Sequence, residues 1–257
     1  MPQRRLSGSP TTLRGALRFG VALAAAVLLV ALLPQPAPAQ RAEADVLVAQ
    51  AILAYEGKRY EEALAILGRA LQADPNHVEA LYYTGLVRIT LGRLAEAVEP
   101  LEKARSLDPK DKAIPFQLGV VYFGLGRYEQ AQPLLEQVFA TDPKLENLGY
   151  YVGFMRYRNK DYQGALRAFR AGTSTDINIQ QLSRFYTGLA LAILGLPERA
   201  AAEIDEALRL HPASPLTGHA ERLRTAVAGA RERERRFRVE ARLGGFFDDN
   251  VAVIPDK

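Results

Sequence analysis

Hydrophobic and small residues recur along the chain with the spacing of paired amphipathic helices. The pairs are separated by turn signals such as Gly92-Arg93 and Gly126-Arg127. Closing prolines at 75, 109 and 143 lie 34 residues apart, and a copy with Ile177 in the proline column precedes Pro212. This pattern predicts helical hairpins at about 44–73, 78–107, 112–141, 146–174 and 180–210.

Two columns of small residues repeat through these hairpins. One lies on the first helix of each pair, and the other lies twelve residues later on the second helix. Small side chains allow two helices to approach closely, so we expect both columns at helix crossings. The residues predicted to have this structural role are Gly85, Ala97, Gly119, Ala131, Gly153, Ala165, Gly188 and Ala200.

The unit resembles the tetratricopeptide repeat, because Gly or Ala, Tyr, Ala, Phe or Leu, and a closing Asp-Pro recur in register from Ala44 to Pro212. The resemblance implies an all-α, right-handed superhelical solenoid of about five hairpins in a domain spanning 44–212. Its units would be about 44–77, 78–111, 112–145, 146–180 and 181–214. The fourth unit lacks the closing proline and places Gly172 in a helix, so we expect it to be the loosest.

In this family the first helix of each unit lines a concave groove that holds partners. The corresponding positions here are apolar or aromatic, which predicts a groove with an aromatic ladder. A carboxylate clamp is not expected, because the first two units lack Lys, Asn and Arg at these positions. The residues predicted to bind a partner are Tyr55, Tyr82, Phe116, Phe123, Tyr150, Phe154, Tyr157 and Phe185. The alternative is that the rings pack between hairpins or are covered by the chain's own C-terminal helix.

Composition excludes several kinds of chemistry. The 257 residues include no Cys and only three His, which excludes disulfides, thiolate metal sites and a Cys nucleophile. Asp74, Asp108 and Asp142 repeat every 34 residues, which marks them as turn residues rather than catalytic acids. We therefore predict no catalytic residue, no metal site and no cofactor, and we expect that the protein is not an enzyme. An exported hydrolase that uses paired carboxylates, such as Asp248 and Asp249, is the alternative.

The N-terminal segment predicts export. Four Arg and no acidic residue occur in the first 18 positions, followed by the apolar run Phe19 to Leu33 and the small residues Ala37 and Ala39. This pattern predicts a signal peptide over 1–39, and the alternative is an inner-membrane anchor formed by 19–33 in an assembly factor with repeats. The net charge of +4 comes from those four Arg, so a nucleic-acid partner is not expected.

Beyond Pro212 the repeat pattern ends. Residues 215–236 predict a capping helix with a polar outer face, and residues 237–257 alternate apolar and polar positions like a β-strand. This tail resembles the first strand of the outer-membrane barrels that follow periplasmic tetratricopeptide domains, including the surface lipoprotein assembly modifier type. The chain would then continue beyond Lys257 in the intact gene.

Taken together, the sequence predicts an exported scaffold in the periplasm that binds another exported or envelope protein or peptide. If the chain continues as a barrel, the scaffold would be associated with the outer membrane. Membrane contact is expected only through the signal segment or the C-terminal strand.

Overall fold

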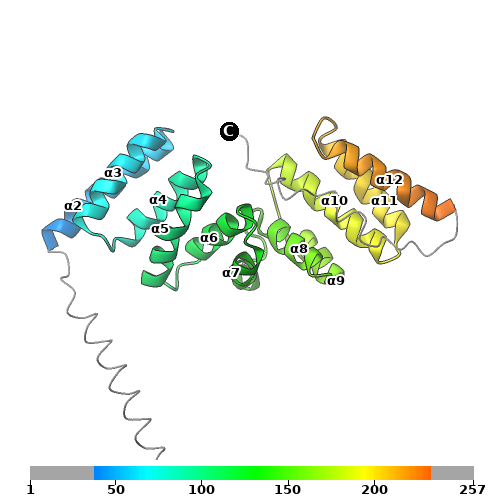
Figure 1. The fold of residues 1–257 in the computed structure, drawn as a ribbon, viewed down its shortest axis with the longest axis horizontal. Coiled ribbons are helices and arrows are strands. Elements are labelled where there is room, and N and C mark those ends of the chain that lie inside the picture. Colours follow the sequence, from blue (N-terminus) through cyan, green and yellow to red (C-terminus); the bar gives the residue numbers. More distant parts are fainter. Residues whose placement is uncertain (1–37, 233–257) are drawn as a thin grey trace, which may run out of the picture.

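The computed structural model describes residues 38–232, which form eleven α-helices and no β-strand (Figure 1). The predicted all-helical fold is confirmed for this part of the chain. The predicted signal segment up to residue 37, the end of the capping helix after 232 and the strand-like tail at 237–257 lie outside the described residues. The helices are α2 (Pro38–Glu56), α3 (Tyr60–Ala73), α4 (Val78–Thr90), α5 (Leu94–Leu107), α6 (Ala113–Gly124), α7 (Tyr128–Thr141), α8 (Leu148–Arg158), α9 (Tyr162–Ala171), α10 (Ile177–Ile193), α11 (Pro197–Leu210) and α12 (Thr217–Glu232).

Within residues 38–232 the helices pack only against near neighbours in the chain. Each of α2, α4, α6, α8 and α10 pairs with the helix that follows it; the first four also contact the first helix of the next pair, and α10 contacts α12. Figure 1 shows the pairs following one another along an arc, from α2 and α3 at one end to α11 and α12 at the other. Such contacts between successive units define a solenoid.

The turn inside each pair has one geometry. After the first helix, a residue adopts a positive φ of 58° to 75°, at Lys58, Gly92, Gly126, Lys160 and Gly195. The next N–H then donates to the carbonyl oxygen five residues earlier, as from Arg93 to Arg88 and from Arg127 to Tyr122. This is the Schellman end of a helix, and it prefers glycine because a left-handed backbone crowds a β-carbon. The turn signals read from the sequence therefore mark real helix ends.

The small columns lie where the two helices of a pair cross. A β-carbon added at Gly85 would lie 2.5 Å from Leu101 Cγ, and one at Gly119 would lie 2.6 Å from Leu135 Cγ. Gly153 faces Phe169 and Gly188 faces Ile204 at similar distances. The second column, Ala97, Ala131, Ala165 and Ala200, has no exposed surface. Glycine on the first helix thus makes room for a large side chain on the second.

The first three connections between pairs share one geometry, and the fourth departs from it. Asp74, Asp108 and Asp142 each follow the last residue of a helix and accept the N–H two residues later on a side-chain oxygen. Their predicted role as turn residues is confirmed. The connection between α9 and α10, residues 172–176, is different, and we call it the shifted junction.

At the shifted junction the chain leaves its helix one turn early. The second helix of this pair has 10 residues, whereas α3, α5, α7 and α11 each have 14. The sequence predicts this pair to reach residue 174, but α9 ends at Ala171 because Gly172 adopts an extended backbone with ψ 153°. The next helix, predicted from about 180, already begins at Ile177, since no proline stands there to delay it.

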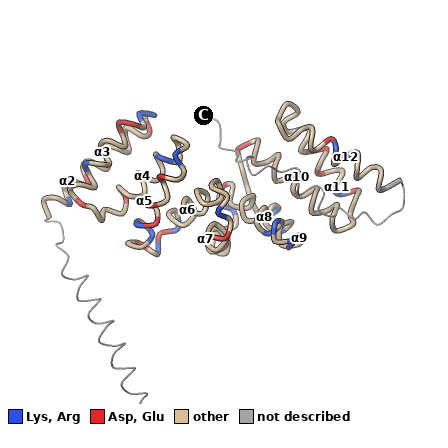
Figure 2. The backbone as a smooth tube through the Cα atoms, viewed as in Figure 1, with Lys and Arg blue, Asp and Glu red and all other residues tan. Residues whose placement is uncertain are grey.

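The charged residues favour the second helices of the pairs. In Figure 2 the tube of α10 is almost entirely tan, and its only charged residue is Arg184. Helix α6 contains no charged residue, whereas α5 and α11 carry acidic and basic side chains along their length. None of the helices in the described range has both the length and the apolar character needed to cross a membrane.

Candidate functional site

The predicted aromatic ladder is only partly accessible. Tyr82 and Phe116 are half-buried, on α4 and α6. Tyr150 and Phe185, at the same repeat position on α8 and α10, are only 6% and 2% exposed. The placement of these two rings on an open groove is therefore wrong, and the alternative, packing between helices, holds for them.

The burial of Tyr150 goes together with a close approach of backbones around α8. A β-carbon added at Gly149 would lie 2.4 Å from the Cα of Gly172 and 2.6 Å from the carbonyl oxygen of Ala168. Two backbones can touch in this way only where both residues lack a side chain. The first helix of this pair is drawn against its partner, and Tyr150 beside Gly149 is enclosed with it.

The remaining predicted rings lie half-buried along the first helices. Tyr55 is on α2, Phe123 on α6, and Phe154 and Tyr157 on α8. The last three join a continuous aromatic cluster: the Phe123 and Phe154 ring centroids are 5.2 Å apart, and Tyr157 lies 5.3 Å from Tyr186. Edge-on contacts of this kind stabilise aromatic pairs beyond the area they bury.

Sequence reasoning missed several members of this cluster. Tyr151 lies 4.9 Å from Phe123 between ring centroids, and Tyr186 lies 5.0 Å from Phe154. Both follow directly after a predicted ladder residue, so the repeat of adjacent aromatic residues at 150–151 and 185–186 was the available signal. Tyr128 on α7 was also missed; the guanidinium carbon of Arg158 lies 3.9 Å from its ring centroid.

Burial fixes the protonation of these phenols. Loss of solvent raises the pKa of Tyr157 to about 12, and neighbouring Tyr162 adds to this effect. Burial likewise raises the pKa of Tyr151 to about 12, with the charge of Asp176 as a second cause. Burial also raises the pKa of Tyr186 above its ordinary value. At neutral pH the cluster is therefore uncharged, and it presents ring faces and neutral hydroxyl groups.

The described residues show no arrangement that resembles a metal site. No group of three or more His, Asp or Glu between residues 38 and 232 is placed to hold an ion. A ring nitrogen of His77 lies 2.9 Å from Asp45 Oδ1, and one of His211 lies 3.0 Å from Asn178 Oδ1. The first contact connects one helix pair to the next, and the second connects the two helices α10 and α11 of one pair, so these side chains have a structural use. That the protein is not an enzyme stays a prediction.

Comparison with protein families supports the repeat directly. Two profiles described as tetratricopeptide repeat match residues 48–112 together with 155–215, and residues 88–148. This chain belongs to the tetratricopeptide repeat family. Its division into five tetratricopeptide units stays a prediction. Curated protein sequences gave no match.

Solved structures of tetratricopeptide proteins share this fold. YrrB, described as a TPR protein with an unusual peptide-binding site, is 22% identical with a TM-score of 0.57, over 68% of this chain and 90% of its own. A crystal structure of MamA is 21% identical with a TM-score of 0.55, and the match covers 66% of this chain and 92% of MamA. MamA from Desulfovibrio magneticus RS-1 is 20% identical with a TM-score of 0.55, and the match covers 67% of this chain and 97% of that chain. At these identities the likeness establishes the tetratricopeptide fold.

Proposed function

We propose that this tetratricopeptide protein is a scaffold that binds an apolar segment of another protein on the faces of its first helices. The family uses extended surfaces of stacked units to hold partners. The observation that carries the proposal is the row of half-buried aromatic side chains that remains after the correction above, on successive first helices. They are Tyr55, Tyr82, Phe116, Phe123, Phe154 and Tyr157.

The chemistry of this row suits an apolar partner. Half-buried rings are already held by their neighbours, so they lose little side-chain entropy when a partner covers them. The helix α6 in the middle of the row has no charged residue. A partner with apolar side chains on one face of a helix would therefore meet rings and aliphatic groups without having to desolvate a charge on this helix.

A direct test uses an amphipathic Leu-Lys helical peptide as a fluorescent probe of the full chain. Replacing Tyr82 or Phe116 by Ala should weaken probe binding by about 1–3 kcal/mol if either ring is an anchor. The matched control is Phe139→Ala, because Phe139 is also half-buried but lies on α7, a second helix. Equal losses from all three changes, or no loss from the first two, would contradict the proposed surface.

We further propose that the scaffold acts in the periplasm, as the sequence of residues 1–39 suggests. Cleavage after Ala39 would leave α2 almost whole, because this helix begins at Pro38. A mature protein that begins at Gln40 and is released from the periplasm supports export with cleavage. Retention of Met1 in the inner membrane would instead support the anchor alternative.

An association with an outer-membrane barrel is the finer version of this proposal. It rests on the strand-like alternation in residues 237–257 and on nothing in the described range. The DNA that follows codon 257 tests it: regular alternating segments of about ten residues would support a barrel. A catalytic domain there would favour the hydrolase alternative.

A further inference from the structure

A cavity of about 530 Å³ lies over α10, between α9 and α11. The shifted junction forms one of its borders, since Gly172, Thr173 and Ser174 line it. The two helices on either side make no contact with each other in the described fold. The cavity therefore occurs where α9 lacks the last turn that the other second helices possess, and its volume is in the range typical of ligand pockets.

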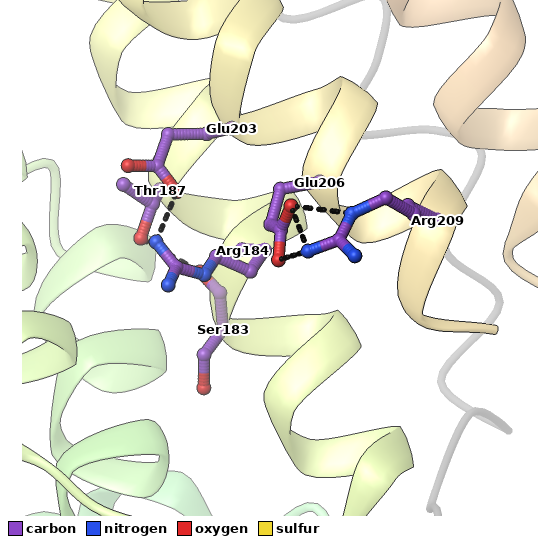
Figure 3. Close-up of polar contacts among 6 residues, drawn as sticks. All are labelled: Ser183, Arg184, Thr187, Glu203, Glu206 and Arg209. Atoms are coloured by element: carbon purple, nitrogen blue, oxygen red, sulfur yellow. Dashed lines mark hydrogen bonds and ion pairs between the residues drawn. The ribbon is translucent and has the colours of Figure 1, made fainter.

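The acidic side chains in the lining already have partners. Arg184 Nη1 on α10 donates to Glu203 Oε2 on α11 at 2.8 Å (Figure 3). Glu206 accepts hydrogen bonds from two nitrogens of Arg209 at 2.7 to 3.0 Å, in the forked geometry also visible in Figure 3. Both carboxylates are thus neutralised within the protein.

Two basic side chains in the lining are left over. Arg170 comes from the last turn of α9 and Arg199 from the first turn of α11. Both are exposed, and neither has a hydrogen bond or ion pair with another residue of the described range. The floor between them carries polar groups of α10, including Ser183 and Gln180. The cavity therefore has one Arg without such a partner on each of two walls, α9 and α11, and polar groups on the floor between them.

We propose that this cavity binds a polypeptide segment carrying two nearby carboxylates. A guanidinium recognises a carboxylate through two parallel hydrogen bonds, so each free Arg can hold one acidic side chain. A segment with two such side chains can use Arg170 on α9 and Arg199 on α11 together. This site is separate from the aromatic row and does not depend on it.

The two carboxylates can come from a partner protein or from this chain. Asp248 and Asp249 are adjacent in the sequence and lie outside the described residues. The chemistry that the cavity recognises is the same in both cases. A variant of the full chain with Asp248→Asn and Asp249→Asn distinguishes the two sources, because it removes only the internal one.

The experiment measures binding of a fluorescein-labelled octapeptide of alternating Glu and Gly to the full chain by anisotropy, with a Gln-Gly octapeptide for comparison. We expect the Glu peptide alone to bind, and Arg170→Gln or Arg199→Gln to weaken it at least fivefold. Arg167→Gln is the matched control, since Arg167 is exposed on the same helix as Arg170 but does not line the cavity. It should leave affinity unchanged within twofold.

Each outcome decides between explanations. Equal weakening by Arg167→Gln would show diffuse charge attraction and overturn the site, as would equal binding of both peptides or no effect of Arg170→Gln and Arg199→Gln. Displacement of the probe by phosphate well below the concentration of an equivalent salt control would replace the peptide ligand by a small anion. Tighter probe binding to the Asp248→Asn, Asp249→Asn variant would identify this chain as the source, and unchanged binding would identify a partner. The test of the aromatic row, which measures binding of the Leu-Lys probe to the Phe116→Ala variant, is independent of all these outcomes.

Discussion

The connection between α5 and α6 and the shifted junction between α9 and α10 solve the same problem in different ways. After α5, Asp108 ends the helix, Pro109 follows, and the next helix starts at Ala113. After α9, Gly172 ends the helix one turn early, its backbone rests against Gly149, and α10 again starts five residues later, at Ile177. The first solution keeps the period of the array. The second moves the turn, brings two backbones together beside the buried Tyr150 and borders a cavity.

The regular pair and the shifted junction also differ in the kind of contact that their glycines make. At the regular pair, Gly119 faces the side chain of Leu135, which can shift slightly to accommodate a change. At the shifted junction, Gly149 faces backbone atoms, which cannot. The shifted junction is held instead by polar contacts: Asn147 N–H donates to the carbonyl oxygen of Thr173 at 2.8 Å, and Thr173 Oγ1 donates to that of Lys144 at 2.8 Å. The geometry of the shifted junction thus depends on close backbone contacts and on these two hydrogen bonds.

The largest difference in the free energy of unfolding is expected between two Gly→Ala variants, one at the shifted junction and one in a regular pair. Gly149→Ala should lower the free energy of unfolding by about 3 kcal/mol, because the new carbon meets the backbone of α9. Gly119→Ala should cost only about 1 kcal/mol, since Leu135 can move and alanine favours a helix. Urea unfolding of both variants measures the difference, and equal midpoints would show that the shifted junction is no more rigid than the regular pair.

The second-largest effect is expected from the buried side-chain amide of Gln181, which contacts the end of α11. Gln181 on α10 is 2% exposed and donates to the carbonyl oxygens of Ala207 and His211, each at 2.9 Å. In α5 the equivalent carbonyl, that of Ala104, is satisfied by the backbone N–H of Asp108 instead. Gln181→Leu should therefore cost about 2 kcal/mol, because it leaves the buried carbonyl oxygen of Ala207 without its donor. Gln137→Leu, at an exposed position of α7, is the control, and a similar loss there would contradict the assigned role.

The pH dependence of stability tests the aromatic cluster beside the shifted junction. Since burial raises the pKa of Tyr157 to about 12, folding favours its neutral form. This contribution to stability is complete below the ordinary tyrosine pKa of about 10 and is lost as pH rises through 12. Tyr157→Phe cannot ionise, so it should resist alkaline unfolding above pH 10 better than the parent, relative to their stabilities at pH 7. Circular dichroism with absorbance at 295 nm follows both processes, and parallel losses of stability would contradict this linkage.

The smallest effect is expected at the turns within pairs. Lys58 and Lys160 have positive φ values of 58° and 63°, where Gly92, Gly126 and Gly195 stand in the other pairs. Replacing either Lys by Gly removes the strain of a β-carbon in the left-handed region, and should raise the free energy of unfolding by up to about 1 kcal/mol. Thermal melts suffice to detect this. A decrease at either position would contradict this assignment of strain to the Lys β-carbon.

Much of the fold could be predicted from the sequence because its determinants are local or periodic. Gly92 and Gly126 mark turns through backbone conformation, and Asp74 and Asp108 mark them through hydrogen bonds to their own neighbours. Gly119 marks a helix crossing because a repeated small residue has few other uses in a helix. Each of these signals acts within one unit, so it can be read without knowing how the units stack.

The candidate site was less predictable, since it depends on how far apart neighbouring units lie. Phe116 and Tyr150 occupy the same repeat position, yet one is half-buried and the other is only 6% exposed. Sequence period cannot separate them, because Tyr150 lies beside the contact of Gly149 on α8 with Gly172 in the shifted junction, and Phe116 has no such contact beside it. The missing proline in the fourth unit was visible, but its consequence for the next helix was not.

By itself, the sequence determined the helical pairs, their turns and the small residues at their crossings, through periodic burial and left-handed turn geometry. Only the tertiary structure decided which rings stay accessible and where a cavity forms. It also decided that Arg170 and Arg199 lie on two helices that do not touch, without a hydrogen-bond or ion-pair partner among residues 38–232. The physical reason is that exposure and charge pairing depend on distances between units, and one early helix end at Gly172 changes those distances on both sides of α10.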